Sequence, residues 1–309
     1  MRLSIRQTIR RTIRRTVRIA CLAGLLCGLM LVGACSPPRP DHPVIGAKNF
    51  TEQVILGELL AQHIEATTGL RVERRFYLAG SYIAHQALIS GRIDGYVEYT
   101  GTALTAILKQ PLQREAARTR ETVARLYREK YGVEMTPPLG FENTFAMVMR
   151  GDDARRLGLR TLSDIAKVAP TLRLGVGYEF QERPDGLRGM SATYGLHFAG
   201  TPRVMDLGLL YRALNARQVD IVAGNSTDGP IRAFGLVALE DDKHYFPPYE
   251  AVPLVRESAL ERWPQLRSAL AGLGDKVSAE EMQSMNNAVD GEHRDPADVV
   301  REFRARKGL

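Results

Sequence analysis

The chain has 309 residues and a formal net charge of +7, from 42 Lys and Arg residues against 35 Asp and Glu residues. Seven of the arginines precede residue 19, so the rest of the chain is balanced, with 35 basic against 35 acidic residues. A balanced chain lacks the basic surface that nucleic-acid binding requires, so we expect no nucleic-acid partner. All three cysteines lie within the first 35 residues. The remainder is long enough for two domains and must be stabilised by packing rather than by disulfide bonds.

The N-terminal segment has the pattern of a lipoprotein signal peptide. A basic region ending at Arg18 is followed by an uncharged run over residues 19–34, and a Val-Gly-Ala-Cys sequence ends at Cys35. We predict a signal peptide over residues 1–34, a lipidated Cys35 and a Pro-rich tether over residues 35–42. The protein would then be periplasmic or otherwise extracytoplasmic and anchored to the membrane by lipid. The alternative is an uncleaved anchor, although the apolar run is short of the about 20 residues that a spanning helix needs.

After the tether, strands and helices alternate. A strand at 44–46 leads into a helix that Thr51 can cap and that Gly69 ends. Alternation of this kind predicts right-handed βαβ units on a largely parallel sheet. Further strands are expected at 71–76 and 93–96, and further helices at 80–91, 103–108 and 113–130.

Two Pro-Pro breaks, at 136–140 and 246–249, divide the chain. Between them the pattern predicts strands at 145–149, 172–176, 219–223 and 237–240, and helices that start at Thr161 and span 189–194 and 207–215. After the second break we expect a strand at 252–255 and several helices, one beginning at Asp295-Pro296. We therefore predict a discontinuous lobe 1 (residues 43–142 plus 247–309) and an inserted lobe 2 (residues 143–246). Two chain crossings make a hinge, and the cleft between lobes is the expected ligand site.

The stretch from Gly91 to Leu104 is the clearest candidate for part of such a site. It runs from a predicted strand into a helix and carries two tyrosines and two threonines at the junction. Ligands in open α/β sheets bind beyond the carboxyl ends of strands, where helix N-termini expose N–H groups. The alternative is an ordinary turn with tyrosines that serve only packing.

Five motifs occur in order along the chain and together carry a family resemblance. They resemble the substrate-binding proteins of osmoprotectant ABC importers, of the glycine betaine/choline/carnitine type, from about Val44 to the last residue. The resemblance implies an α/β fold, the type II periplasmic binding protein, whose two lobes close on a ligand. It also implies permease and ATPase subunits as partners. The motifs are Lys48-Asn-Phe-Thr-Glu-Gln53, Glu98-Tyr-Thr-Gly-Thr102, Leu139-Gly-Phe-Glu-Asn-Thr144, Ser226-Thr-Asp-Gly229 and Asp241-Asp-Lys243 with Phe246-Pro-Pro-Tyr249.

The resemblance also implies a binding site for a small cationic or zwitterionic ligand. A quaternary ammonium has no N–H to donate, so aromatic faces recognise it, each contact contributing about 0.5–2 kcal/mol. A carboxylate is held by cationic and hydroxyl groups. By position in the family pattern, the cage walls are Tyr99, Phe145 and Tyr249, and Asn143 adds a polar contact. Lys48, Thr102 and Arg183, the last in a Glu-Arg-Pro-Asp sequence, hold the anion.

Some of these assignments have alternatives. Lys48 could be a solvated loop residue, Arg183 a turn residue paired with Asp185, and Tyr245 competes with Tyr249. Asn225 stands where many relatives have a tyrosine, which weakens the case for tight betaine binding. The ligand could therefore be another polar solute, such as an amino acid or a modified betaine, and the protein could also be a ligand-sensing receptor.

An enzyme is disfavoured. Asp94, Glu98 and Asp228 are carboxylates near strand ends, but the sequence has no nucleophile elbow, phosphate-binding loop or dinucleotide fingerprint. The six histidines have no metal-ligand spacing, so we expect neither a metal nor a cofactor.

Overall fold

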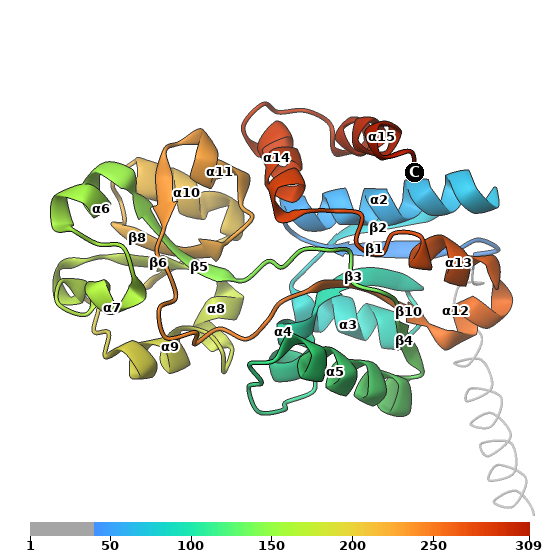
Figure 1. Cartoon of the computed structure of the whole chain (residues 1–309), viewed down its shortest axis with the longest axis horizontal. Helices are drawn as coiled ribbons and strands as arrows, with labels where there is room; N and C mark the ends of the chain where they lie inside the picture. The colour runs from blue at the N-terminus through green and yellow to red at the C-terminus, as the bar shows by residue number, and fades with distance from the viewer. Residues whose placement is uncertain (1–39) are drawn as a thin grey trace, which may run out of the picture. The chain divides into compact units, whose positions relative to one another are not determined.

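The computed structural model describes residues 40–309. The predicted signal peptide, the lipidation site Cys35 and most of the tether lie outside the described residues. Residues 42–309 form one compact unit that contains two five-stranded sheets (Figure 1). We call each sheet, together with the helices packed on it, a lobe. Within residues 40–309, no helix is both long and apolar enough to cross a membrane.

Lobe 1 combines strands from both ends of the described chain, in the order β2-β1-β3-β10-β4. Strand β1 is parallel to β2 and β3, whereas β10 is antiparallel to both of its neighbours. The strands are β1 (Val44–Lys48), β2 (Glu73–Leu78), β3 (Gly95–Tyr99), β4 (Val133–Met135) and β10 (Ala251–Arg256). The helices are α2 (Thr51–Thr68), α3 (Ser81–Ile89), α4 (Thr100–Thr102), the π-helix η2 (Ala103–Ile107), α5 (Ala116–Tyr131), α12 (Glu257–Arg262), α13 (Gln265–Ala271), α14 (Ala279–Asp290) and α15 (Pro296–Lys307).

Lobe 2 is one continuous segment with the strand order β7-β6-β8-β5-β9. Strand β6 is parallel to β7 and β8, whereas β5 is antiparallel to both of its neighbours. The strands are β5 (Phe145–Arg150), β6 (Leu174–Val176), β7 (Arg203–Val204), β8 (Ile221–Asn225) and β9 (Leu236–Ala238). The helices are α6 (Gly151–Leu157), α7 (Leu162–Ile165), the 3-10 helix η3 (Ala169–Thr171), α8 (Tyr178–Glu182), α9 (Leu187–Tyr194), α10 (Leu207–Asn215) and α11 (Gly229–Ala233).

The antiparallel strand of each sheet is the one that follows a crossing between the lobes. The chain leaves lobe 1 just before β5 and returns from lobe 2 just before β10, along the two connecting segments visible in Figure 1. A chain that arrives from the other lobe enters a sheet at the edge facing that lobe. Because the parallel strands end at this same edge, the entering strand must run against them. The predicted largely parallel sheets are therefore mixed sheets.

Several residues that were predicted to begin or end helices do so in the structure. Thr161 and Asp164 form a capping box at the predicted start of α7, and the Asp295 carboxylate accepts from the Ala297 N–H at the start of α15. Gly69 ends α2 in the left-handed conformation, with φ of 71°. The predicted Thr51 cap is wrong, because Phe50 is the N-cap residue and Thr51 lies inside the first turn.

The strand boundaries are less accurate than the helix boundaries. The strand predicted at 93–96 spans 95–99, and that predicted at 71–76 spans 73–78. In both cases main-chain pairing continues past the predicted end of the strand, because Leu78 pairs with Lys48 and Tyr99 pairs with Ala251. Helix α10, at 207–215, has the predicted bounds.

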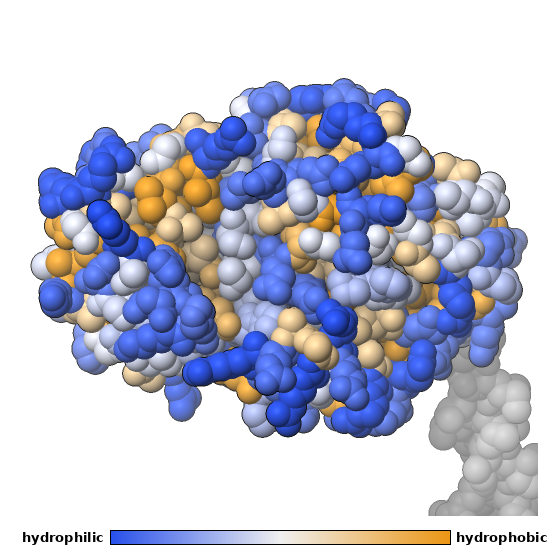
Figure 2. Space-filling model, viewed as in Figure 1, coloured by the Kyte–Doolittle hydropathy of each residue, from blue (hydrophilic) through white to orange (hydrophobic). Residues whose placement is uncertain are grey.

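Both sheets are covered on both faces. In lobe 1, α2, α13, α14 and α15 pack on one face and α3, η2 and α5 on the other. In lobe 2, helices α7 to α9 cover one face and α10 the other. On the face shown in Figure 2, hydrophilic residues cover most of the surface and hydrophobic residues lie in small patches. With the sheet faces filled by apolar side chains, the strand ends between the lobes are left for polar groups.

Candidate ligand-binding site

A cavity of about 120 Å³ lies between the two lobes. It is built on strand ends, where open α/β sheets bind ligands. Lys48 and Tyr99 end β1 and β3, whereas Phe145 begins β5 and Asn225 ends β8. All eight residues predicted from the sequence line this one cavity: Lys48, Tyr99, Thr102, Asn143, Phe145, Arg183, Asn225 and Tyr249.

The crossing segments, at residues 141–145 and 245–249, supply three of these residues, and two of the three are bonded to each other. The Asn143 N–H donates to the Tyr249 carbonyl over 3.1 Å, which joins the two crossings. Gly101 lets the Tyr249 ring approach the start of α4, because a Cβ at Gly101 would lie 2.7 Å from ring atoms. The Glu-Tyr-Thr-Gly-Thr motif therefore requires glycine at position 101 for a steric reason. Without a side chain there, Tyr249 can lie beside Thr102.

A buried carboxylate, Glu52, organises one wall of the cavity. Its side chain is almost fully buried and accepts four hydrogen bonds, all from neutral groups. The donors are the Tyr99 hydroxyl (2.6 Å), the Asn143 amide (2.8 Å), the Asn286 amide (2.9 Å) and the Thr227 hydroxyl. Burial raises the pKa of Glu52, and the four hydrogen bonds oppose that shift. We call these five residues the Glu52 cluster; it links lobes 1 and 2, because Thr227 follows β8.

A second buried group surrounds Arg183. Its guanidinium pairs with both oxygens of Asp185, at 2.9 and 2.5 Å. Asp185 also accepts from the Thr105 hydroxyl (2.9 Å) and the Tyr249 hydroxyl (2.5 Å). Burial alone would raise the pKa of Asp185, but the Arg183 charge and these hydrogen bonds outweigh it and hold the pKa below its ordinary value. We call these four residues the Arg183 cluster.

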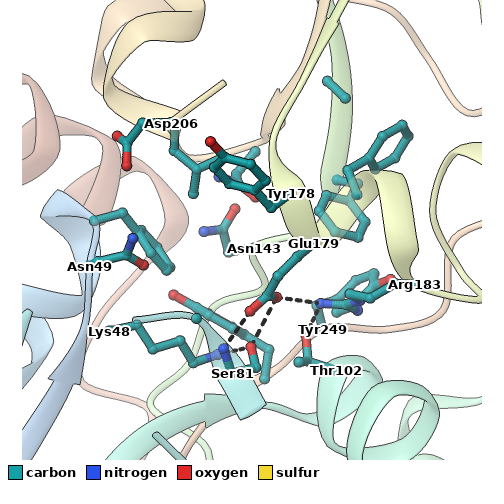
Figure 3. Close-up of a pocket in the computed structure, with 18 residues that line it drawn as sticks. Lys48, Asn49, Ser81, Thr102, Asn143, Tyr178, Glu179, Arg183, Asp206 and Tyr249 are labelled. Carbon is teal, nitrogen blue, oxygen red and sulfur yellow. Dashed lines mark hydrogen bonds and ion pairs between the residues drawn. The ribbon is translucent and has the colours of Figure 1, made fainter. Parts of the chain in front are cut away.

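The Glu179 carboxylate lies among the three residues predicted to hold an anion (Figure 3). It accepts from the N–H and the hydroxyl (3.0 Å) of Ser81, and from Arg183 Nη1 at 3.4 Å. Lys48 Nζ donates to the same Ser81 hydroxyl over 2.8 Å and to Glu98. Arg183 Nη1 donates to the Thr102 hydroxyl over 3.0 Å. Burial favours a raised pKa for Glu179, but the charges of Lys48 and Arg183 outweigh it and lower the pKa.

The three predicted cage rings each lie close to a protein cation. The Arg183 guanidinium is 4.8 Å from the centre of the Phe145 ring and 5.8 Å from that of Tyr249. Lys48 Nζ is 5.1 Å from the centre of the Tyr99 ring. The cavity also contains aromatic side chains that sequence reasoning missed, namely Phe50, Tyr178 and Phe180.

The structure decides between some of the alternatives left open by the sequence. Tyr249 lines the cavity, whereas the Tyr245 hydroxyl donates to the Pro184 carbonyl. Lys48 is buried, with 3% of its surface exposed, so it is not a solvated loop residue. Arg183 both lines the cavity and forms the turn pair with Asp185 that was the competing interpretation.

Asn225, which stands where many relatives have a tyrosine, is hydrogen-bonded to Asp228. Its side-chain amide donates to Asp228 at 3.3 Å, and its backbone N–H donates to the same carboxylate at 2.8 Å. Asp228 also accepts from the Tyr211 hydroxyl at 2.6 Å, and burial raises its pKa to about 6. The amide is therefore held by its own strand-end turn.

Residues 43–306 match the family described as the substrate binding domain of ABC-type glycine betaine transport systems, called OpuAC. The chain belongs to the OpuAC family. It is the solute-binding component of an ABC importer and is not an enzyme, because this is a family of transport binding proteins. It is accordingly an extracytoplasmic protein.

Individual relatives of this OpuAC-family protein agree in length with the chain. It is 35% identical over 286 residues to the carnitine transport binding protein OpuCC of Listeria monocytogenes, covering 90% of this chain and 92% of OpuCC. It is 36% identical over 276 residues to a glycine-betaine-binding protein of Pseudomonas aeruginosa, covering 84% and 86%. A solved glycine betaine/carnitine/choline ABC transporter structure superposes with a TM-score of 0.73 at 34% identity, covering 86% of this chain and 98% of that one.

Sequence reasoning on this OpuAC-family chain missed two carboxylates that organise the cavity. Glu52 lies inside the first motif, and its place in the first turn of a helix was the available signal. Glu179 lies four residues before Arg183 on a short helix that was not predicted. Across residues 40–309, no group of three or more His, Cys, Asp or Glu side chains could hold a metal ion.

Proposed function

We propose that the protein captures a small betaine-type solute, one with a quaternary ammonium, in the cavity between its lobes and delivers it to the permease and ATPase of its importer. The observation that carries this proposal is the composition of the cavity wall. Six aromatic side chains surround a space into which Lys48 and Arg183 also project. Aromatic faces suit the ammonium end, and the cationic groups suit a carboxylate at the other end.

The charges around the cavity support a ligand that carries a cation. Lys48 is paired with Glu98, and Arg183 is paired with Asp185. Glu179 then adds a third carboxylate beside these two cations. The wall thus has no surplus positive charge, and it would attract an ammonium group rather than a simple anion.

We assign roles to the cavity residues on this basis. Tyr99, Phe145 and Tyr249 contact the ammonium, while Lys48, Thr102 and Arg183 hold the opposite end of the ligand. Asn143 and Asn225 offer polar contacts at the boundary between the lobes.

Phe145 gives the cleanest test, because it is the cage ring without a hydroxyl to lose. Phe145→Leu keeps an apolar side chain but removes the π face, so we expect glycine betaine and choline to bind about 5- to 30-fold more weakly, or about 1–2 kcal/mol. Phe145→Tyr keeps the ring and serves as the matched control. Calorimetry on the two variants measures the difference. Equal affinity for Leu and Tyr variants would argue against an aromatic cage, and no binding of any quaternary ammonium by the unaltered protein would refute the assignment.

We further propose that the two crossings, at residues 141–145 and 245–249, form the hinge between lobe 1 (43–142 plus 247–309) and lobe 2 (143–246). Small-angle scattering should then record a smaller radius of gyration when a ligand that binds in calorimetry is added. An unchanged radius would indicate lobes that do not move.

We also propose that Cys35 carries the lipid that anchors the mature chain to the membrane. The small residues and apolar run before it support this assignment. Intact-mass measurement on the membrane fraction should give a chain that begins at Cys35 with added acyl groups, and a Cys35→Ser variant should lose them. A mature chain that begins elsewhere would contradict the anchor.

A further inference from the structure

The Glu179 carboxylate occupies the place where a ligand carboxylate would be held. Of the three residues assigned to the anion, Arg183 donates to it directly, Lys48 shares the Ser81 hydroxyl with it, and Thr102 shares Arg183 Nη1 with it. In Figure 3 the Glu179 side chain extends between Lys48, Ser81 and Arg183. A protein carboxylate thus makes the contacts that the proposed function gives to the solute.

The surroundings of Glu179 are shaped around this carboxylate. Its two oxygens accept from the main-chain N–H and the hydroxyl of Ser81, the first residue of α3. Gly80 precedes it, and a Cβ there would lie 2.1 Å from Glu179 Oε1. A side chain at position 80 would therefore push the carboxylate out of its place. The contact also joins the lobes, since α8 belongs to lobe 2 and α3 to lobe 1.

Charge makes this arrangement incompatible with a second carboxylate. The two cations already have partners of their own in Glu98 and Asp185. Their charges also lower the pKa of Glu179, so its carboxylate is ionised at neutral pH. A ligand carboxylate placed beside it would meet a like charge at close range, which is unfavourable where little water screens it.

We propose that Glu179 is a specificity-determining residue that competes with the carboxylate of a zwitterionic ligand for Arg183, Thr102 and the Lys48–Ser81 pair. The inference rests on the function proposed above. A betaine must displace the Glu179 side chain before its own carboxylate can bind. A cation with a neutral tail leaves Glu179 in place and gains from its negative charge. Since 30% of the Glu179 side chain is exposed, it has room to swing away when displaced.

The test compares two ligands that share a trimethylammonium group. Glycine betaine ends in a carboxylate and choline ends in a hydroxyl. In Glu179→Gln the competing charge is gone, so glycine betaine should bind more tightly and choline more weakly. We expect the ratio of the two dissociation constants to move by roughly tenfold or more towards glycine betaine. Gly80→Ala, which displaces the carboxylate without removing it, should move the ratio in the same direction.

Glu182→Gln is the matched control, because it makes the same charge change on the same helix at an exposed position. It should leave the ratio unchanged. If Glu179→Gln binds both ligands more weakly by the same factor, Glu179 is only a contact between the lobes and the proposal is overturned. An unchanged ratio of the two dissociation constants would also overturn it. Failure of the unaltered protein and every variant to bind either ligand would instead refute the quaternary-ammonium function itself. Thermal unfolding of each variant confirms that it is folded.

Discussion

The Glu52 cluster and the Arg183 cluster both contribute side chains to the wall of one cavity, but they compensate a buried carboxylate in different ways. Each holds a buried carboxylate that links lobe 1 to lobe 2. Glu52 is surrounded by two hydroxyls and two amides, so neutral dipoles compensate its charge. Asp185 is paired with a guanidinium and receives two hydroxyl hydrogen bonds in addition.

This difference predicts how much a substitution in each cluster lowers the stability of the protein. Removing one member of a buried ion pair leaves an uncompensated charge, which destabilises a protein by about 3–5 kcal/mol. Removing one of several neutral donors costs about 1–3 kcal/mol, because the remaining donors still solvate the carboxylate. A single substitution in the Arg183 cluster should therefore lower the free energy of unfolding more than a single substitution in the Glu52 cluster.

The largest effect is expected for Asp185→Asn. Arg183 is 4% exposed and would lose the charge that it contacts through two nitrogens. We expect the free energy of unfolding to fall by about 3–5 kcal/mol in urea denaturation. Asp152→Asn, which removes the charge from an exposed pair with Arg155, is the control and should change stability by less than about 1 kcal/mol. Similar losses for both variants would contradict the contrast.

A smaller loss is expected for Glu52→Gln. Each oxygen of Glu52 accepts two hydrogen bonds, so an amide nitrogen in place of either oxygen must face an Asn143 or Asn286 amide donor. One buried donor is then unpaired, and we expect a loss of about 1–3 kcal/mol in the free energy of unfolding. Thr227→Val, which removes a single hydroxyl donor, should cost about 1 kcal/mol. If Glu52→Gln lowers the free energy of unfolding as much as Asp185→Asn does, the predicted difference between the two clusters is wrong.

The pH dependence of stability gives a further test, on the Asp228 carboxylate, which is buried among neutral hydrogen-bond donors. Burial raises the pKa of Asp228 to about 6 in the folded protein. A raised carboxyl pKa means that this group stabilises the fold most below its unfolded pKa, near 4, and that the contribution is lost as pH rises through about 6. The unaltered protein should therefore lose stability relative to Asp228→Asn by about 1–3 kcal/mol between pH 4 and pH 7.5. Denaturation of both proteins across that range measures the difference, and parallel pH profiles would contradict the raised pKa.

The smallest expected effect is a gain in ligand affinity at Asn225, outside both clusters. If the amide only replaces a missing cage wall, Asn225→Tyr should tighten binding of glycine betaine or choline by a few fold, about 0.5–1 kcal/mol. Asn225→Leu adds bulk without a polarised ring and controls for packing. Weaker binding in the tyrosine variant, measured by calorimetry, would mean that the amide contacts a polar group of the ligand.

Much of the fold could be predicted because it depends on neighbours in sequence. Helix α10, the capping box at Thr161 and the glycine that ends α2 each involve residues a few positions apart. The eight predicted site residues also meet in one cavity. Most of them lie in or beside the ordered motifs, at strand ends and crossings, whereas Arg183 lies in the turn that follows α8. Their roles in binding stay predictions.

Other features depend on partners far away in the chain. The extra length of β3 comes from pairing with β10, about 150 residues later, and no local pattern contains that partner. Thr51 has a good capping side chain, but Phe50 adopts the extended conformation and leaves Thr51 to donate to Asp290. Local propensity was overridden there by a contact between α2 and α14.

The sequence by itself determined the family, the class of fold and which segments approach the cavity, because apolar periodicity, turn residues and ordered motifs are local properties of the chain. Only the tertiary structure decided which carboxylate meets which donor. Glu52 and Glu179 are both acids in the first turn of a helix, and the sequence predicted neither as a site residue. Folding surrounds Glu52 with donors from four distant segments and brings Glu179 across the cleft to Ser81. A side chain's electrostatic role is set by every group within a few ångströms of it, and these groups come together only when the chain is folded.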